Sequence, residues 1–172
     1  MDLQAFKQHI LPVQARLFRL AQMFLRNREE AEDATQNVLL KLWSNRQKLG
    51  TYQSVEALAV QMTKNECLDR IKLHSRQKLS YDADTSLAAA KEVSPYVQVE
   101  LTDSISLVRR LMDALPDQQK LVLHLREVEE YSLEEIEQVT GLSSANVRVI
   151  LSRARQKLRE NYLKNNDYEA GN

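Results

Sequence analysis

Apolar residues recur at intervals of three and four along most of this chain, the spacing that places side chains on one face of an α-helix. The first such stretch covers residues 5–26, and we expect Pro12 to break or restart it. A second stretch begins after Asn27, a candidate N-cap, and a third covers residues 54–77 with Ser54 as its N-cap. The pattern therefore predicts three long helices in the first half of the chain.

The third predicted helix changes character along its length. Its face begins apolar and continues at the same spacing as polar residues, namely Val55, Leu58 and Met62 followed by Asn65, Asp69, Lys72 and Arg76. A stripe that turns polar midway is typical of a helix that leaves the core and meets a polar partner. A solvated helix end gives the same pattern, so periodicity leaves both interpretations open.

The last third of the chain has the same helical spacing in shorter segments. One apolar stripe stops at Pro116, and Asp117 can cap the next helix. Ser132 and Glu135 match the capping box, in which each side chain bonds the free backbone amide of the other residue. Gly141 then suits a tight turn, because a left-handed backbone costs glycine least. These signals predict three short helices before a final one.

The final helix, which Ser143 can cap, has an apolar face and a basic face. The apolar face comprises Val147, Leu151 or Ile150, Ala154 and Leu158, which leaves Ser144, Arg148, Ser152 and Arg155 facing outward, flanked by Val149 and Arg153. Hydroxyl and guanidinium groups can bond base edges and phosphates. A helix, a glycine turn and a second, basic helix form the plan of a helix-turn-helix, whose second helix lies in the major groove. An ordinary helical hairpin with a basic, solvated face is the alternative.

Residues 79–104 separate the two helical parts. The segment is acidic, rich in small residues and without a period, which predicts a mobile linker with at most a short helix at 86–92. With only three glycines and three prolines in the chain, the predicted fold class is all-α. We expect two small helical domains, 1–78 and 105–165, joined by this flexible linker, followed by a tail at 166–172, and not packed together in the free protein.

Charge is distributed unevenly, although the 24 basic and 24 acidic residues cancel. Residues 1–78 carry 13 basic and 8 acidic side chains, residues 79–104 carry 1 and 5, and residues 105–172 carry 10 and 11. Within the last part, residues 127–137 hold six acids and no base, whereas residues 148–164 hold six bases and one acid. A neutral chain sorted in this way can present basic surfaces to nucleic acid.

Other classes of protein lack support in the sequence. No apolar run approaches the roughly 20 residues that span a bilayer, and the N-terminus lacks the pattern of a signal peptide, so we expect no membrane insertion and a cytoplasmic location. Cys67 is the single cysteine, which excludes an intrachain disulfide and suggests a buried thiol. The three histidines have no ligand-spaced partner and no glycine-rich phosphate loop occurs, so we expect no metal, no cofactor and no enzymatic activity.

Three segments resemble conserved regions of the extracytoplasmic-function (ECF) RNA polymerase sigma factors, a branch of the sigma-70 family. The stretch LPDQQKLVLHLREVEEYSLEEIEQVTGLSSANVRVILSRARQKLRE is similar to their fourth region, and NREEAEDATQNVLLKLW resembles their second region. The helix SVEALAVQMTKNECLDRIK resembles the promoter-melting part of that second region. The segments occur in the family order with a linker between them, and the Asn-Val-Arg-Val run at 146–149 resembles Bacteroidetes members.

The resemblance implies a transcription initiation factor that binds core RNA polymerase and promoter DNA, with an anti-sigma factor as a further partner. By resemblance, the clamp of the polymerase would contact Asp33, Gln36 and Asn37. The melted minus-ten strand would lie near Asn65, Asp69, Arg70, Lys72 and Arg76. The bases of the minus-thirty-five element would face Arg148, Val149 and Ser152, and its phosphates would lie near Arg153 and Arg155.

The chain departs from the family pattern at several positions. Asn37 stands where glutamate is common, Val55 stands near a frequent tryptophan, and Ile150 replaces a commonly polar residue. Glu130 replaces a frequent glycine. Glu137 replaces a frequent alanine that packs under the turn, so we expect the first helix of the helix-turn-helix to be slightly displaced.

Two other functions remain open from the sequence. An autonomous helix-turn-helix transcriptional regulator would bind an operator as a dimer, but it usually carries a dimerisation or ligand domain, and the N-terminal half resembles a polymerase-binding region instead. A helical interaction protein with no role on DNA would make the basic face at 148–159 dispensable. Dependence of promoter binding on polymerase distinguishes the regulator from a sigma factor.

Overall fold

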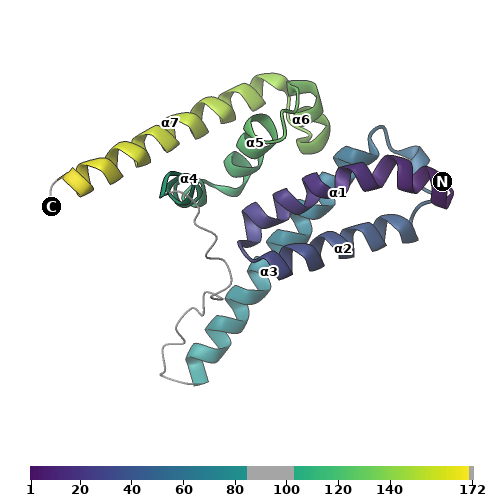
Figure 1. Cartoon of the computed structure of the whole chain (residues 1–172), viewed down its shortest axis with the longest axis horizontal. Helices are drawn as coiled ribbons and strands as arrows, with labels where there is room; N and C mark the ends of the chain where they lie inside the picture. Colours follow the sequence, from purple (N-terminus) through teal and green to yellow (C-terminus); the bar gives the residue numbers. More distant parts are fainter. Residues whose placement is uncertain (85–102, 171–172) are drawn as a thin grey trace.

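The structure, a computed structural model, describes residues 1–84 and 103–170 of the 172-residue chain. Within those residues it contains seven α-helices, one short 3-10 helix and no strand, which confirms the all-α prediction (Figure 1). The elements are α1 (Leu3–Leu25), α2 (Arg28–Ser44), η1 (Leu49–Thr51), α3 (Val55–Asp84), α4 (Asp103–Asp113), α5 (Asp117–Glu127), α6 (Leu133–Thr140) and α7 (Ser144–Ala170). None of these helices is both long and apolar enough to cross a membrane.

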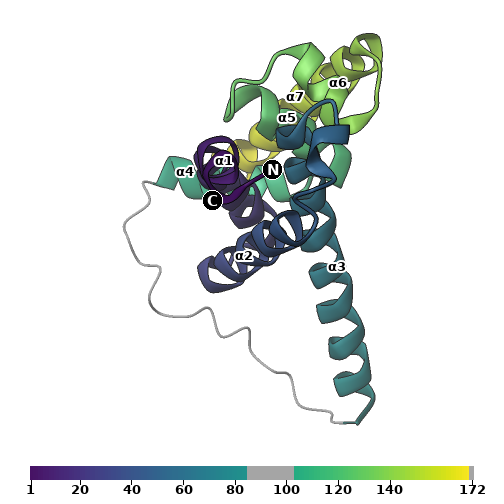
Figure 2. The same ribbon diagram turned by 90° about the vertical axis from the view of Figure 1, so that its right-hand side faces the viewer.

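Helices α1, α2 and α3 pack against one another as the first unit (Figure 2). Asp2, Asn27 and Ser54 cap these helices by accepting hydrogen bonds from backbone amides three residues later, at 2.8 Å, 3.0 Å and 3.1 Å. The predicted caps Asn27 and Ser54 are therefore confirmed. The apolar faces meet in a core that includes Ile10, Leu17, Leu20, Ala31, Val38, Leu42, Val60 and the predicted buried thiol of Cys67.

Pro12 lies within α1 and does not break it, which corrects the sequence-based prediction. Proline lacks the amide that would bond the carbonyl four residues earlier. Pro12 is exposed, so water can reach that carbonyl. Its neighbours Ile10 and Val13 are buried, and the packing of their side chains holds both halves of the helix against the core.

Helix α3 is 30 residues long and continues past the core into solvent (Figure 1). Its residues 71–80 are all exposed. The helix extends beyond the predicted linker boundary, since residues 79–84 belong to it, and no glycine or proline lies between Gly50 and Pro95 to end it. The predicted short helix at 86–92 lies outside the described residues.

Helices α4 to α7 form the second unit, in which α7 packs on α4, α5 and α6. The capping box of α6 is confirmed: Ser132 Oγ accepts a hydrogen bond from the Glu135 amide at 3.1 Å, and the Glu135 carboxylate accepts one from the Ser132 amide at 2.7 Å. Asp117, predicted to cap α5, is instead the first residue of that helix, and Pro116 holds the cap position. An acid at the first residue still suits the positive end of the helix dipole. Helix α7 continues to Ala170, through most of the predicted tail.

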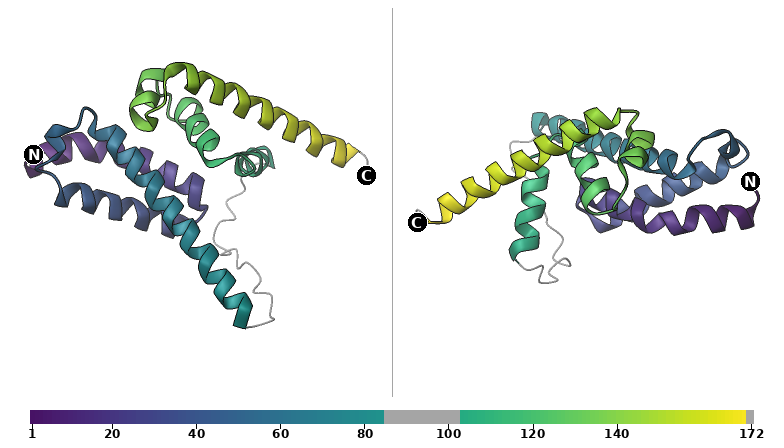
Figure 3. Two further views of the ribbon diagram at one scale, coloured as in Figure 1. Left: turned by 180° about the vertical axis from the view of Figure 1, so that it is seen from behind. Right: turned by 90° about the horizontal axis from the view of Figure 1, so that it is seen from above.

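The two units contact each other, so the expectation that the domains stay apart in the free protein is wrong (Figure 3). Helix α3 packs on α6, and one buried core cluster includes residues of both units. Ion pairs join α1 to the second unit through Arg19 with Glu129 and Arg26 with Asp113. Arg19 and Glu129 are 110 residues apart in sequence, which is why no local pattern predicts their pairing.

Candidate nucleic-acid and polymerase interface

Helix α7 presents the predicted DNA-binding face to solvent. Val147, Leu151 and Ala154 are buried at 0 %, 4 % and 0 % exposure. Ile150 is only half-buried, so Leu151 is the core residue of the two alternatives. The opposite face carries five exposed side chains, those of Arg148, Val149, Ser152, Arg153 and Arg155. The helix thus gathers these predicted groups on one surface. Ser144, also predicted to face outward, is instead half-buried.

Two side chains cap the N-terminus of α7. The Ser143 hydroxyl accepts a hydrogen bond from the Asn146 amide at 3.3 Å, and the Glu137 carboxylate accepts one from the amide of the half-buried Ser144. Glu137 belongs to α6, so its hydrogen bond ties the two helices of the motif together across Gly141, which has a φ of 71°. Glu137 therefore stabilises the positive, N-terminal end of α7. The replacement of the frequent alanine by glutamate did not by itself predict this role.

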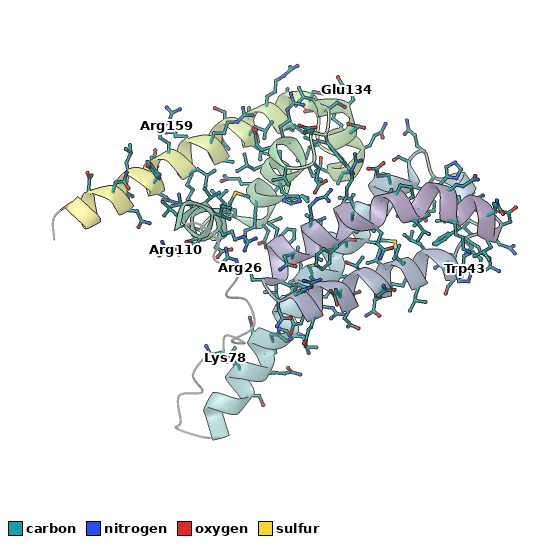
Figure 4. The ribbon with its side chains drawn as sticks, in the orientation of Figure 1. Arg26, Trp43, Lys78, Arg110, Glu134 and Arg159 are labelled. Carbon is teal, nitrogen blue, oxygen red and sulfur yellow. The ribbon has the colours of Figure 1, made fainter. Side chains whose placement is uncertain are left out.

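Further arginines lie beside the predicted face. Arg148 and Arg155 line a groove together with Arg126 of α5 and Arg159, which Figure 4 labels on α7. Neither Arg126 nor Arg159 was among the individual residues predicted to contact DNA. Arg155 donates hydrogen bonds to the Glu127 carboxylate, one of them at 3.1 Å, in a pair whose side chains are about half exposed. Such exposed pairs contribute little to stability.

The outer part of α3 exposes most of the polar residues predicted to meet the melted strand. Asn65, Asp69, Lys72 and Arg76 are exposed, and the labelled Lys78 lies farther along the same projecting helix (Figure 4). The apolar stripe therefore does turn polar where the helix leaves the core. The exposure by itself fits both a solvated helix end and a binding surface.

Arg70 differs from these residues because carboxylates already hold it. Its side chain is 20 % exposed and donates hydrogen bonds to Asp33 at 2.7 Å and to Glu66 at 3.1 Å. Glu66 also accepts hydrogen bonds from Asn37 at 3.4 Å and Lys41 at 2.7 Å. The structure thus brings Arg70, predicted to lie near DNA, together with Asp33 and Asn37, predicted to contact polymerase.

Glu66 is the centre of this network and was missed by the sequence-based prediction. Burial alone would raise the pKa of its carboxyl, but hydrogen bonds from Lys41, Asn37 and Arg70 outweigh burial and lower that pKa. The spacing of Glu66 and Arg70, at i and i+4 on a helix, is a signal that could have predicted their pairing. The contacts with α2 carry no such signal.

The remaining predicted polymerase contacts lie on α2. Asp33 and Gln36 are exposed and line a shallow surface groove between α1 and α2. Leu11 and Phe18 of α1 lie in the same groove. Because Asn37 is half-buried beside Glu66, it presents less of its side chain to a partner than its two neighbours do.

Comparison with known families gives two matches. Residues 10–77 match the family model described as sigma-70 region 2, and residues 105–158 match that described as sigma-70, region 4. The chain belongs to the sigma-70 family. Region 2 corresponds to α1, α2 and most of α3, whereas region 4 corresponds to α4, α5, α6 and the first half of α7.

Known sigma factors resemble the whole chain. SigW of Bacillus subtilis (strain 168), an ECF RNA polymerase sigma factor, is 23 % identical over 92 % of this chain and 89 % of its own length. SigM of the same organism, also an ECF sigma factor, is 25 % identical over 85 % of this chain and 88 % of its own length. The probable RNA polymerase sigma factor RfaY of Xanthomonas campestris is 28 % identical over 95 % of this chain, but the chain spans only 42 % of that protein.

A solved structure supports the fold. The sigma factor RpoE from Bartonella quintana, in complex with the anti-sigma factor NepR, matches with a TM-score of 0.70 and 22 % identity over 93 % of this chain and 98 % of that one. Together with the two regions and the relatives, this likeness confirms that the chain is an ECF sigma factor. The resemblance to Bacteroidetes members in particular stays a prediction.

Proposed function

We propose that this sigma factor binds core RNA polymerase and directs it to specific promoters, with region 4 reading the minus-thirty-five element and region 2 holding the melted minus-ten strand. The observation that carries the proposal is the presence, on one chain, of region 2 followed by region 4 with a basic, exposed face on α7. The chain acts in this proposal by binding and not by catalysis, and it needs no cofactor.

The minus-thirty-five element would lie against α7. In the major groove, the guanidinium of Arg148 is suited to bond the edge of guanine, and the Ser152 hydroxyl can bond donors or acceptors on a base edge. Val149 offers an apolar contact to the methyl group of thymine. Arg153 and Arg155 would neutralise phosphates, which supplies affinity and positions the helix without reading sequence. Arg155 would exchange Glu127 for phosphate as it binds.

The minus-ten strand would lie along the exposed part of α3. Lys72 and Arg76 supply positive charge, and Asn65 and Asp69 supply groups that can bond the edges of unstacked bases. Arg70 would contact this strand only after exchanging at least one of its two carboxylate partners. Binding of the strand by Arg70 would therefore depend on whether Asp33 is paired with Arg70 or bound by the polymerase clamp.

The clamp of the polymerase would bind α2 through Asp33, Gln36 and Asn37. Two of these side chains are exposed, and polar groups of this kind add little to the stability of a core. Asn37 has a local reason for replacing the common glutamate, since a carboxylate at this position would lie beside Glu66. We place the protein in the cytoplasm, where RNA polymerase acts, and propose an anti-sigma factor as a further partner, as RpoE has NepR.

Runoff transcription with purified core RNA polymerase on a genomic library tests the proposal. We expect the sigma factor to produce discrete transcripts from a limited set of promoters, and core polymerase alone to produce none. Sequence-specific DNA binding that is equally strong with and without polymerase, and no transcripts, would instead support an autonomous regulator. Promoter sequences from the first outcome would supply the duplexes for variants of α7.

A further inference from the structure

Glu137 makes contacts on both sides of the turn that joins α6 to α7. It lies in α6, and its side chain is half-buried. Its backbone carbonyl accepts a hydrogen bond of 2.8 Å from the amide of Gly141, the residue that ends α6. Its carboxylate accepts a hydrogen bond from the amide of Ser144, the first residue of α7. Glu137 thus ties the end of one helix to the beginning of the next.

Two hydroxyl groups of the turn make local hydrogen bonds. Thr140 Oγ1 accepts one from the Leu142 amide at 3.2 Å. Ser143 Oγ accepts one from the Asn146 amide at 3.3 Å. These bonds join residues two and three positions apart, so neither connects the body of α6 to α7. The Glu137 bond joins residues seven positions apart, and its acceptor is a carboxylate, which forms stronger hydrogen bonds than a neutral oxygen does.

Apolar packing by itself leaves the placement of α7 incompletely fixed. Ile136 and Val139 of α6 are exposed by only 0 % and 3 %, and Val147 of α7 by 0 %. Attraction between such side chains is non-directional, so it resists separation of the helices more than it resists a small rotation or sliding of α7. A directional hydrogen bond at the first residue of α7 opposes both movements.

The Glu137 bond is close to the residues proposed to read bases. Arg148 follows Ser144 by four residues, which is about one turn of helix, and Ser152 lies one turn farther on. The side chains of Arg148 and Ser152 are exposed. A recognition group must be held within about 0.5 Å of its productive position, so a shift at the first turn of α7 would displace Arg148 by enough to matter.

The charge of Glu137 has a second consequence. The first turn of α7 contains no acidic residue, so Glu137 of α6 supplies the negative charge that suits the positive end of this helix. Backbone amides at such an end attract anions, including phosphates. Because the Glu137 carboxylate already bonds the Ser144 amide, it takes the place of a phosphate there and repels one nearby. Phosphate contacts are then left to the exposed arginines farther along, Arg153 and Arg155.

We infer that Glu137 is a positioning residue for reading the minus-thirty-five element: its carboxylate fixes α7 on α6, which aims Arg148 at base edges, and keeps a phosphate away from the N-terminal end of α7. The inference rests on the proposed function and adds to it a residue that would not itself contact DNA. Bases then contribute a larger share of binding, and phosphates a smaller share, than they would with the alanine that is frequent here in ECF sigma factors.

Three substitutions separate the hydrogen bond from the charge. Glu137→Ala removes both and suits the interior of a helix. Glu137→Gln keeps an oxygen that can accept from the Ser144 amide and removes only the charge. Glu134→Gln is the matched control, because it removes the same charge three residues earlier on α6, at the exposed side chain that Figure 4 labels.

Holoenzyme made from full-length sigma factor and core RNA polymerase is offered promoter duplexes with a randomised minus-thirty-five element, at several salt concentrations. We expect Glu137→Ala to lower the preference for the parent's element over single-base variants roughly tenfold, which is within the discrimination that one good base contact supplies. Glu137→Gln should keep most of that preference. Both variants should show a steeper salt dependence, by up to about one further phosphate contact. Glu134→Gln should keep the preference and steepen the salt dependence less.

Any of three results overturns the inference: a Glu137→Ala holoenzyme that keeps the preference of the parent, a Glu137→Gln holoenzyme with unchanged salt dependence, or equal changes in Glu134→Gln. A purely structural role for Glu137 would lower the amount of active holoenzyme without altering either quantity, so it would give the first two results. Circular dichroism checks the helicity of each variant, and the salt dependence of Glu137→Gln carries the test if Glu137→Ala fails to fold.

The same measurements separate this inference from the proposed function. A parent holoenzyme that shows no preference among minus-thirty-five elements contradicts the proposed function, and the role of Glu137 with it. A parent with a clear preference that Glu137→Ala fully shares contradicts the role of Glu137 alone.

Discussion

Glu130 has a backbone conformation that its side chain does not favour. Its φ is 58°, in the left-handed region, in the turn between α5 and α6. The side chain is exposed, and among the described residues it forms no ion pair. Glycine, which is frequent here in ECF sigma factors, adopts this conformation without a clash between Cβ and the backbone. We therefore expect Glu130→Gly to stabilise the protein.

The size of the effect follows from two opposing contributions. A left-handed backbone costs an ordinary L-residue roughly 1–2 kcal/mol. Glycine gives back about 0.4–1 kcal/mol, because its unfolded chain has more conformational freedom to lose. The net gain in the free energy of unfolding is about 0.5–1 kcal/mol, which for a chain of this length corresponds to a rise in Tm of roughly 1–4 °C.

Thermal and urea unfolding of the parent and the variant measure this gain. Glu130→Ala is the control: it removes the same carboxylate but keeps a Cβ, so it should not be stabilised. Gly141→Ala is the reverse test, since Gly141 has a φ of 71° and a Cβ there has free space around it, so only backbone strain opposes the change. If Glu130→Gly unfolds more easily than the parent, or if Glu130→Ala gains as much, the left-handed strain is not the cause.

Three further predictions concern function and pH. Arg148→Ala should relax base preference by about 1–3 kcal/mol at one position, whereas Arg153→Ala should weaken binding to all sequences and reduce the salt dependence of binding. Selection of binding sites from random duplexes measures both effects, and an unchanged preference would show that Arg148 does not read bases. Because Gln36 is exposed, Gln36→Lys should weaken binding to core polymerase in titrations at two salt concentrations while changing stability by no more than about 0.5 kcal/mol. Core binding equal to that of the parent would contradict the assignment of α2. Burial raises the pKa of the Glu129 carboxyl, but the hydrogen bonds from Arg19 outweigh burial and lower that pKa in the folded protein. The contribution of Glu129 to the free energy of unfolding is therefore complete above its ordinary value of 4.5 and is lost as pH falls through the lower folded value. The free energy of unfolding, measured by urea unfolding, should therefore fall on acidification more in the parent than in Glu129→Gln, and identical responses would exclude this carboxylate as the cause.

Much of the fold and part of the site were predictable because they depend on residues close together in sequence. The caps at Asn27, Ser54 and Ser132 each bond an amide three residues away, so composition at those spacings suffices to predict them. The basic face of α7 follows in the same way, since a period of 3.6 residues fixes which side chains oppose a buried stripe. The sequence alone could not choose between Ile150 and Leu151 as the core residue, because both are apolar and they are adjacent. Only the packing of α7 on its neighbours decides that Leu151 is buried and Ile150 half-buried.

The sequence by itself determined that this protein is helical, where most helices begin, which residues share the face that would meet DNA, and which family it resembles. Tertiary structure decided that Pro12 stays within a helix, that Glu137 caps α7, that Arg70 is held by carboxylates, and that Glu129 joins region 4 to region 2. The first set depends on hydrogen bonds and periodicity within about one turn of helix. The second depends on burial and on charges brought together from distant segments, and these exist only after the helices have packed.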